Sequence, residues 1–175
     1  HRLWERYLAD ETGLPETEWH SRAELNEHSL TPAELDELSE QLGNPLHDPH
    51  GDPIPTSDGH VVPHGGTPLT EAEPGSLVRI VHVEDEPEAV YKQLIAEGLY
   101  PNMVGRITEM TPQRLSFWVE GEEHLLAPIV ARNISVLPVP EEETSETELH
   151  ERLSSLKAGE RAKVVSISRA CRASE

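Results

Sequence analysis

The segment 44–68, near the middle of the chain, is unsuited to any regular helix or strand. Its sequence, "NPLHDPHGDPIPTSDGHVVPHGGTP", is rich in proline, glycine and aspartate, which interrupt helices and strands and favour turns. A long loop, partly ordered by its prolines, therefore separates two stretches whose apolar patterns differ. With 175 residues, the chain has room for one or two small domains with modest cores.

The residues before this loop follow a helical pattern. The opening segment "HRLWERYLADE" places its large apolar side chains on one stripe, which predicts a helix that ends at the following "TGLP". A second helix is expected over 16–30. A third has a start signal, because Thr31 can act as its N-cap and Glu34 can complete a capping box, and Gly43 is a natural end.

The residues after the loop have the pattern of short strands. "SLVRIVHV" (76–83) alternates as a strand does, and "PEAVYKQLIAEG" (87–98) predicts a short helix that ends at Gly98. Further short apolar segments follow before residue 140. Several short strands with one helix between the first two indicate a small half-open β-barrel over 69–139.

The C-terminal part of the sequence repeats the beginning of this barrel. "LTEAEPGSLVRIVHV" (69–83) and "LSSLKAGERAKVVSI" (153–167) align without a gap, glycine with glycine and apolar with apolar positions. The acidic stretch 140–148 carries no basic residue and predicts a solvated linker. Residues 149–175 are therefore expected to be an incomplete second copy of the barrel.

Together these patterns predict an α+β multidomain chain. We expect an all-α domain at 1–62, a short linker at 63–68 and the small β-barrel at 69–139. The acidic linker and the truncated second barrel follow.

The charge balance limits the classes of partner. Acidic side chains outnumber basic ones by 33 to 14, which gives a formal net charge of -19. Such an excess repels phosphate, so the chain by itself should not bind nucleic acid, but it can attract divalent cations. The single cysteine, Cys171, cannot form an internal disulfide, and no apolar run approaches the length of a membrane span. We therefore expect a cytoplasmic protein and no membrane contact by this region itself.

Six imidazole and carboxylate side chains near the N-terminus have spacings that suit a metal site. Steps of four, seven and eight residues return to one side of a helix, and a helical hairpin would bring two such sets together. Solvent-facing residues of an acidic helix show similar spacings, so that alternative stays open. The candidates are His1 and Glu5 in the first helix, and His20, Glu24, Glu27 and His28 in the second.

The donor types indicate which metals would fit. Imidazoles and carboxylates without a thiolate favour Mn(II) or Fe(II), and a closed structural Zn(II) site is less favoured. The sequence contains no H-E-x-x-H motif, so we do not expect a hydrolytic enzyme. The loop "HDPHGDP" (47–53) offers more imidazoles and carboxylates, but its proline and glycine are typical of turns, and we interpret it as a structural connection.

The motifs together resemble a known family. "HRLWERYL…GLP…WHSRAELNEHSLT…LGNPLHDPHGDPIP" is similar to the metal-binding and dimerisation domain of the DtxR/MntR family of metal-dependent repressors. The segment 69–139 resembles the SH3-like FeoA domain that often follows in that family, and 149–175 resembles the start of another.

The resemblance implies two metal sites on the helical hairpin. Their ligands, carried over by position, are His1, Glu5 and His20 for an ancillary site and Glu24, Glu27 and His28 for a primary, activating site.

Two features bear on the metal and on the remaining ligands. Iron-type members have cysteine at position 24, whereas Glu24 matches the manganese-type members, which favours Mn(II). Iron-type members take two further ancillary ligands from the SH3-like domain, for which Glu84 and Glu86 are the expected matches, with Glu88 as the alternative to Glu86. An acidic turn between a strand and a helix would look the same.

The resemblance also implies a function. The chain is expected to be the metal-sensing part of a homodimeric Mn(II)- or Fe(II)-dependent repressor, and not an enzyme. DNA would be contacted only through a winged-helix domain, which we expect before His1 in a longer protein and which is missing from this chain. The alternative is a cytosolic regulatory tail fused to a manganese/zinc-type ABC transporter permease.

Overall fold

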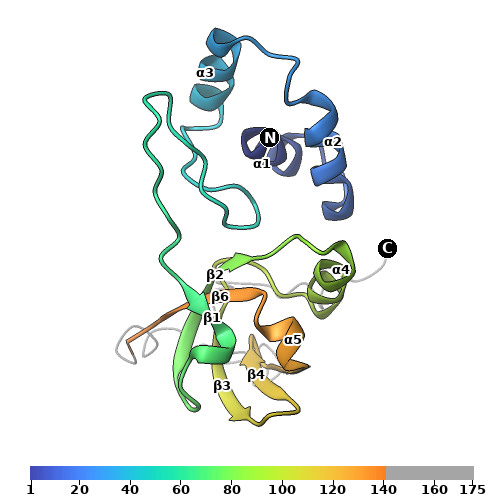
Figure 1. Ribbon diagram of the computed structural model, residues 1–175, viewed down its shortest axis with the longest axis vertical. Coiled ribbons are helices and arrows are strands. Elements are labelled where there is room, and N and C mark those ends of the chain that lie inside the picture. The colour runs from blue at the N-terminus through green and yellow to red at the C-terminus, as the bar shows by residue number, and fades with distance from the viewer. Residues whose placement is uncertain (141–175) are drawn as a thin grey trace, which may run out of the picture.

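The computed structural model describes residues 1–140, which form a group of helices, a long loop and an antiparallel sheet (Figure 1). The predicted α+β order is confirmed: the helices come first in the chain and the six-stranded sheet follows. The stretch after residue 140, and with it the predicted second barrel copy, lies outside the described residues. Within residues 1–140, no helix is both long and apolar enough to cross a bilayer.

Three helices make up the N-terminal part. Helix α1 spans Arg2–Glu11 and packs against α2, which spans Trp19–Asn26 after a single 3-10 turn, η1, at Glu16–Glu18. The second helix is shorter than the predicted 16–30. The backbone N–H and hydroxyl of Ser29 both donate to the carbonyl of Asn26, at 2.9 and 2.6 Å, and tighten the chain into a turn there.

Helix α3, Pro32–Gln41, confirms the predicted start signal. The Thr31 hydroxyl accepts from the backbone N–H of Glu34 at 3.4 Å, and the Glu34 carboxylate accepts from the backbone N–H of Thr31 at 2.8 Å. This reciprocal capping box satisfies two backbone donors that the first turn leaves without partners. Gly43 follows the helix with a positive φ of 79°, which suits the predicted glycine end.

The strands form a single antiparallel sheet in the order β1-β6-β2-β3-β4-β5, with no pairing between β1 and β5 within residues 1–140. This sheet occupies the region of the predicted half-open barrel, and we call residues 67–138 the barrel. The helix predicted over 87–98 is α4, and Gly98 ends it in the left-handed conformation, as expected. A 3-10 turn, η2 (Leu69–Glu71), and a short helix, α5 (Pro128–Ala131), complete this part. The bounds of the remaining elements are β1 Thr67–Pro68, β2 Leu77–Val83, α4 Glu88–Glu97, β3 Val104–Met110, β4 Leu115–Val119, β5 Glu122–Leu126 and β6 Ile134–Pro138.

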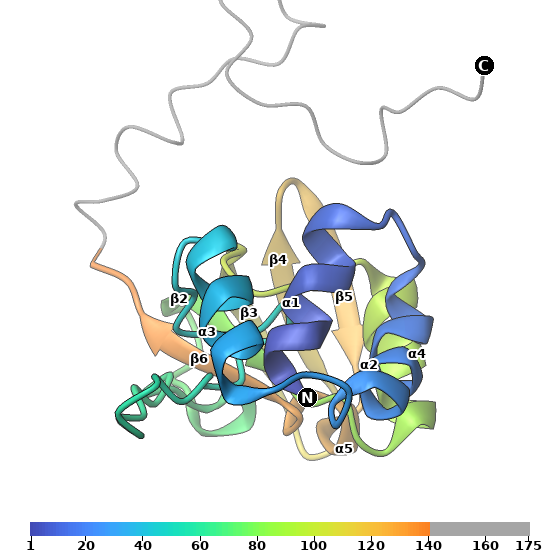
Figure 2. The same ribbon diagram turned by 90° about the horizontal axis from the view of Figure 1, so that it is seen from above.

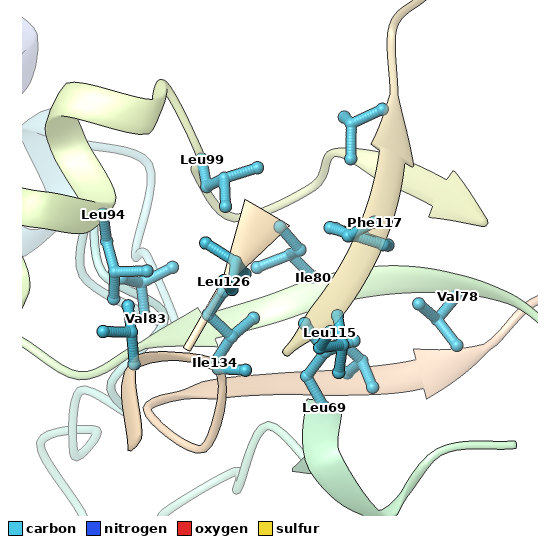
Figure 3. Close-up of a cluster of buried hydrophobic side chains, with 14 of the residues drawn as sticks. Leu69, Val78, Ile80, Val83, Leu94, Leu99, Leu115, Phe117, Leu126 and Ile134 are labelled. Atoms are coloured by element: carbon cyan, nitrogen blue, oxygen red, sulfur yellow. The ribbon is translucent and has the colours of Figure 1, made fainter. Parts of the chain in front are cut away.

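The apolar core lies almost entirely within the sheet and the elements that cover it (Figure 3). Phe117, the only phenylalanine of the chain, is fully buried at its centre beside Ile80 and Leu115. The helical part buries far fewer apolar side chains, namely Leu8, Ala23, Leu38 and Ile54. A core this small gives little hydrophobic stabilisation, so polar contacts must help to set the position of the helices.

Residues 47–54, which we call the docking loop, connect the helices to the sheet. Arg2 of α1 donates to the carbonyl of Pro53 at 2.7 Å and pairs with Asp52 at 3.1 Å. On the other side, Asp52 lies 3.3 Å from the His82 ring on β2, and the backbone N–H of Val83 donates to the carbonyl of His50 at 2.8 Å. The docking loop therefore holds α1 and β2 at the same time.

Gly51 allows the docking loop to approach β2 closely. It has a positive φ of 97°, and a Cβ at this position would lie 2.1 Å from the backbone oxygen of Val81. Backbone cannot move aside as a flexible side chain could, so only glycine fits here.

We expect Gly51→Ala to detach the docking loop and to lower the free energy of unfolding. Gly59→Ala is the matched control, because Gly59 also has a positive φ, 81°, but faces open space. Both variants carry the backbone strain, so the difference between them, about 2 kcal/mol or more, reports the overlap with β2. Urea unfolding followed by circular dichroism measures it, and equal losses in the two variants would contradict the role of Gly51.

Candidate metal centre

Three predicted ligands meet where α1 faces α2. His1 Nε2 lies 3.0 Å from Glu5 Oε1 and 3.3 Å from His20 Nδ1, and His20 Nδ1 lies 3.2 Å from the same Glu5 oxygen. Glu5 is 2% exposed. The i, i+4 spacing within α1 and the packing of α2 against α1 thus bring the three donor atoms together, and we name this set the hairpin cluster.

An acidic residue from the barrel joins the hairpin cluster, and it is Asp85. Its Oδ2 lies 3.1 Å from His20 Nδ1, and its side chain is 15% exposed. Among residues 1–140, no such contact is formed by Glu84 or Glu86, the two barrel positions expected from the sequence, and Glu86 is exposed. Successive side chains of an extended segment point to opposite sides, which explains why the residue between the two expected ones faces the cluster.

A second group of donors lies on the other side of Glu5. Glu5, Asp48 and His50 are all buried, and each has a ligand atom that lies within 4.8 Å of a ligand atom of the other two. His50 Nδ1 is 3.8 Å from Glu5 Oε2 and 4.0 Å from Asp85 Oδ2. We name Glu5, Asp48 and His50 the loop cluster.

The motif "HDPHGDP" contains two members of the loop cluster, Asp48 and His50, although its proline and glycine led us to interpret it as a structural connection. The turn is real: Asp48 Oδ1 accepts the backbone N–H groups of His50 and Asp52, each at 2.9 Å. The same turn buries the His50 ring between Trp19 and Tyr91, with ring centroids at 6.0 and 5.0 Å. One loop thus combines the turn with two candidate ligands.

The remaining predicted ligands lie at the C-terminal end of α2. Glu27 Oε2 is 2.9 Å from His1 Nδ1, so Glu27 touches the hairpin cluster through His1. Its other oxygen is 3.3 Å from His28 Nε2, whose side chain is 92% exposed. Glu24 is exposed as well. Because α2 ends at Asn26, His28 leaves the helical face on which the spacing had placed it.

The buried carboxylates have perturbed pKa values. Burial raises the pKa of Glu5, and Asp85 adds to this, while His50 and His20 oppose it. Burial, followed by the charges of Asp52 and Glu5, raises the pKa of Asp48 to about 8. A cation placed among these groups would stabilise their charged forms.

The pKa values of the two imidazoles, His50 and His20, are shifted in opposite directions. Burial lowers the pKa of His50, which favours the neutral ring that can bind a metal. Burial would also lower the pKa of His20, but the charges of Asp85 and Glu5 outweigh it, and the net shift is upward.

The donors fit a divalent transition metal. Both clusters offer carboxylate oxygen and imidazole nitrogen only, a combination that suits Mn(II) and Fe(II) and also accommodates Zn(II). The buried His50 ring has no hydrogen-bond partner for either nitrogen within the described residues. A buried polar atom without a partner costs free energy, which a bound ion at Nδ1 would offset.

Comparisons with known proteins point in the same direction. Residues 1–56 match the family model described as "Iron dependent repressor, metal binding and dimerisation domain". The iron-dependent repressor IdeR of Mycobacterium tuberculosis (strain ATCC 25618 / H37Rv) is 34% identical over 143 residues, which cover 73% of this chain and 61% of the relative. The chain thus spans about three fifths of the length of such relatives.

Two further similarities concern a solved structure and a membrane protein. A manganese-dependent transcriptional repressor in complex with manganese superposes with a TM-score of 0.75 at 27% identity, covering 79% of this chain and 68% of that one. A probable metal transport system membrane protein of Chlamydia trachomatis is 48% identical over 56 residues, which are 31% of this chain and 12% of the relative.

We expect Asp85→Asn to weaken Mn(II) binding about tenfold or more, because it removes a charged oxygen donor next to His20. Glu86→Gln, one position away and exposed, is the matched control and should change the affinity less than about twofold. Isothermal titration calorimetry measures both. A larger loss in Glu86→Gln than in Asp85→Asn would contradict the assignment.

Metal binding should release protons near neutral pH. With its pKa raised to about 8, Asp48 is mostly protonated at pH 7, and an ion in the loop cluster would displace that proton. The apparent affinity for Mn(II) should therefore rise as the pH is raised from 6 to 8. Calorimetry in two buffers of different ionisation enthalpy counts the protons, and Asp48→Asn should release fewer. An affinity independent of pH over this range would contradict the prediction.

Proposed function

We propose that this chain is the metal-sensing region of a metal-dependent transcriptional repressor, because residues 1–56 match the model of the iron-dependent repressor metal binding and dimerisation domain. The physiological metal we propose is Mn(II), with Fe(II) as the second choice. The observation that carries the proposal is the convergence of His1, Glu5 and His20 from two helices with Asp85 from the barrel.

The hairpin cluster is suited to sensing because its donors come from different parts of the fold. His1 and Glu5 belong to the α1 region, His20 to α2, and Asp85 to the segment between β2 and α4. Figure 2 shows α1 and α2 lying over the barrel, with α2 close to α4. A bound ion would supply positive charge between groups that otherwise repel one another, and these residues would hold the helices against the barrel.

Such an arrangement couples metal occupancy to conformation. An ion that binds only the closed arrangement of α1, α2 and the barrel shifts the population toward it. If the closed arrangement favours operator binding, metal and DNA must increase each other's affinity by the same factor. The chain's charge of -19 opposes direct contact with DNA, so we assign that contact to a winged-helix domain before His1.

We propose that Glu24, Glu27 and His28 form the activating site together with a ligand from the winged-helix domain. Their place at the end of α2 supports this, because Glu24 and His28 face outward, where another domain could reach them. His1 links this position to the hairpin cluster through Glu27, at 2.9 Å.

We further propose that the protein acts as a homodimer, in keeping with the description of the matched family model. Binding rather than catalysis is the role that these features support.

A second candidate function rests on the similarity to the Chlamydia trachomatis membrane protein. There the same helical region would be a regulatory tail that senses metal for a transporter. The two candidates differ in what precedes His1: a winged helix supports the repressor, and several apolar spans support the transporter.

The repressor proposal is tested with the full-length protein and fluorescent DNA selected by that protein in the presence of Mn(II). Fluorescence anisotropy should show binding that requires Mn(II) or Fe(II) and is lost in Glu24→Ala and His28→Ala. Both side chains are exposed, so neither change should unfold the protein. His60→Ala, an exposed histidine away from both clusters, is the control. Metal-independent binding, or unchanged binding in both variants, would falsify the proposal.

A further inference from the structure

Residues 60–66, which we call the strap, form the last part of the long loop that runs from the helices to β1 (Figure 1). Val62, His64 and Gly66 are half-buried, whereas the residues between them are exposed, so one side of the strap faces the barrel. Within residues 1–140, the backbone of 61–65 forms no hydrogen bond with other backbone groups. Side-chain contacts must therefore decide whether the strap stays on the barrel.

The main side-chain contact of the strap is the stacking of His64 on His82 of β2. The two ring centroids are 4.8 Å apart, and the ring planes are inclined by only 6°. The buried His82 ring also contacts the docking loop, because its Nε2 lies 3.3 Å from Asp52 Oδ2. The stacked pair thus joins the strap, β2 and the docking loop.

Gly66 holds the strap close to the sheet and fixes the state of the His64 ring. A Cβ at Gly66 would lie 2.5 Å from Val81 Cγ2 and 3.1 Å from Ser135 Cβ, so a larger residue would push the strap away. The backbone N–H of Gly66 donates to His64 Nδ1 at 3.0 Å. Only an unprotonated Nδ1 can accept, so the ring is neutral and carries its proton on Nε2.

His82, in contrast, is placed to carry a positive charge. Burial would lower the pKa of His82, but its hydrogen bond to Asp52 and the charges of Asp52, Glu84 and Asp48 outweigh burial, and the net shift is upward. The closed strap therefore places a neutral ring on a cationic one, an arrangement that is favourable between a cation and an aromatic face.

The surroundings of His64 oppose a second positive charge. Burial lowers the pKa of His64, and the charge of His82 lowers it further. Asp52 opposes this shift, and the charge of His47 adds a smaller downward contribution. These three residues, from β2 and the docking loop, are the titratable groups that face the ring, and two of them are imidazoles.

A proton on His64 would remove both attachments of the strap at once. Its Nδ1 would become a donor and could no longer accept from the Gly66 backbone. The ring would also carry the same sign of charge as His82, at a centroid distance of 4.8 Å. Because the His64 side chain is only half-buried, water can solvate the protonated ring once the strap has moved away.

We propose that His64 and His82 form a proton-operated latch, in which neutral His64 holds the strap on β2 and protonation of His64 releases it. Release would also expose the Asp52–His82 pair to water and so loosen the docking loop on β2. The latch operates without a metal ion and is therefore separate from the proposed sensing function.

The direction of the pH dependence follows from the shift at His64. Its pKa is lower in the closed arrangement than in a released strap, where the ordinary value of about 6.5 applies. Closure is therefore fully favoured above about 6.5 and is lost as the pH falls through the lower value of the closed ring.

Nuclear magnetic resonance of the 175-residue chain, kept metal-free with a chelator, tests the latch between pH 7.5 and 5. The backbone order parameters of Gly65 and Gly66 should fall from about 0.85, typical of rigid backbone, to below about 0.6. The fall should have the same midpoint as the titration of the His64 ring protons, and this midpoint should lie below about 6.5. Residues of β2 should remain rigid throughout.

Two variants separate His64 from other groups that titrate in this range. His64→Phe keeps a flat ring that can stack on His82 but cannot bind a proton, so the strap should stay closed at pH 5. His60→Phe is the matched control, because His60 is exposed in the same segment, and this variant should open with the midpoint of the unchanged chain.

The latch is overturned if the order parameters of Gly65 and Gly66 stay constant down to pH 5, or if the His64 midpoint lies at or above about 6.5. An equal loss of rigidity in His64→Phe would assign the opening to another group and would also overturn it. If His64→Phe does not fold, the titration of the unchanged chain still decides, because the strap and the His64 ring must then change together.

Discussion

The buried carboxylate of Glu5 is the interaction on which the helical part depends. The helices bury few apolar side chains, whereas the sheet has a continuous core, so polar groups must place α1 and α2. Glu5 lies where α1, α2, the docking loop and the segment after β2 meet. A buried acid surrounded by other acids is unstable without a positive partner, and this makes the packing of the helices sensitive to a cation.

Much of the fold could be predicted from the sequence, because local signals decided it. The Thr31–Glu34 capping box, the glycine end of α4 and the alternation in β2 each depend on a few neighbouring residues, and each is present. The end of α2 could not be predicted in this way. It depends on how Ser29 bonds back to Asn26, which competes with continued helical bonding in a segment whose helical spacing would extend further.

The site was predictable only where its members share a helix or a hairpin. Spacing within α1 and a helical hairpin predicted that the pair His1 and Glu5 would meet ligands from the second helix, and the family resemblance singled out His20 among these. Asp85, Asp48 and His50 come from loops, whose conformation depends on contacts distant in sequence, such as Gly51 against β2. An alternating pattern also cannot say which of the adjacent acids turns inward, and a displacement by one residue reverses the side.

Anomalous diffraction from crystals grown with Mn(II) gives the most direct test of the central claim, that a cation joins the two helices to the barrel. A map calculated at a wavelength where manganese scatters anomalously should show a peak within bonding distance of the Glu5 carboxylate, His20 and Asp85. Anomalous density confined to exposed carboxylates elsewhere, with none beside Glu5, would contradict the account.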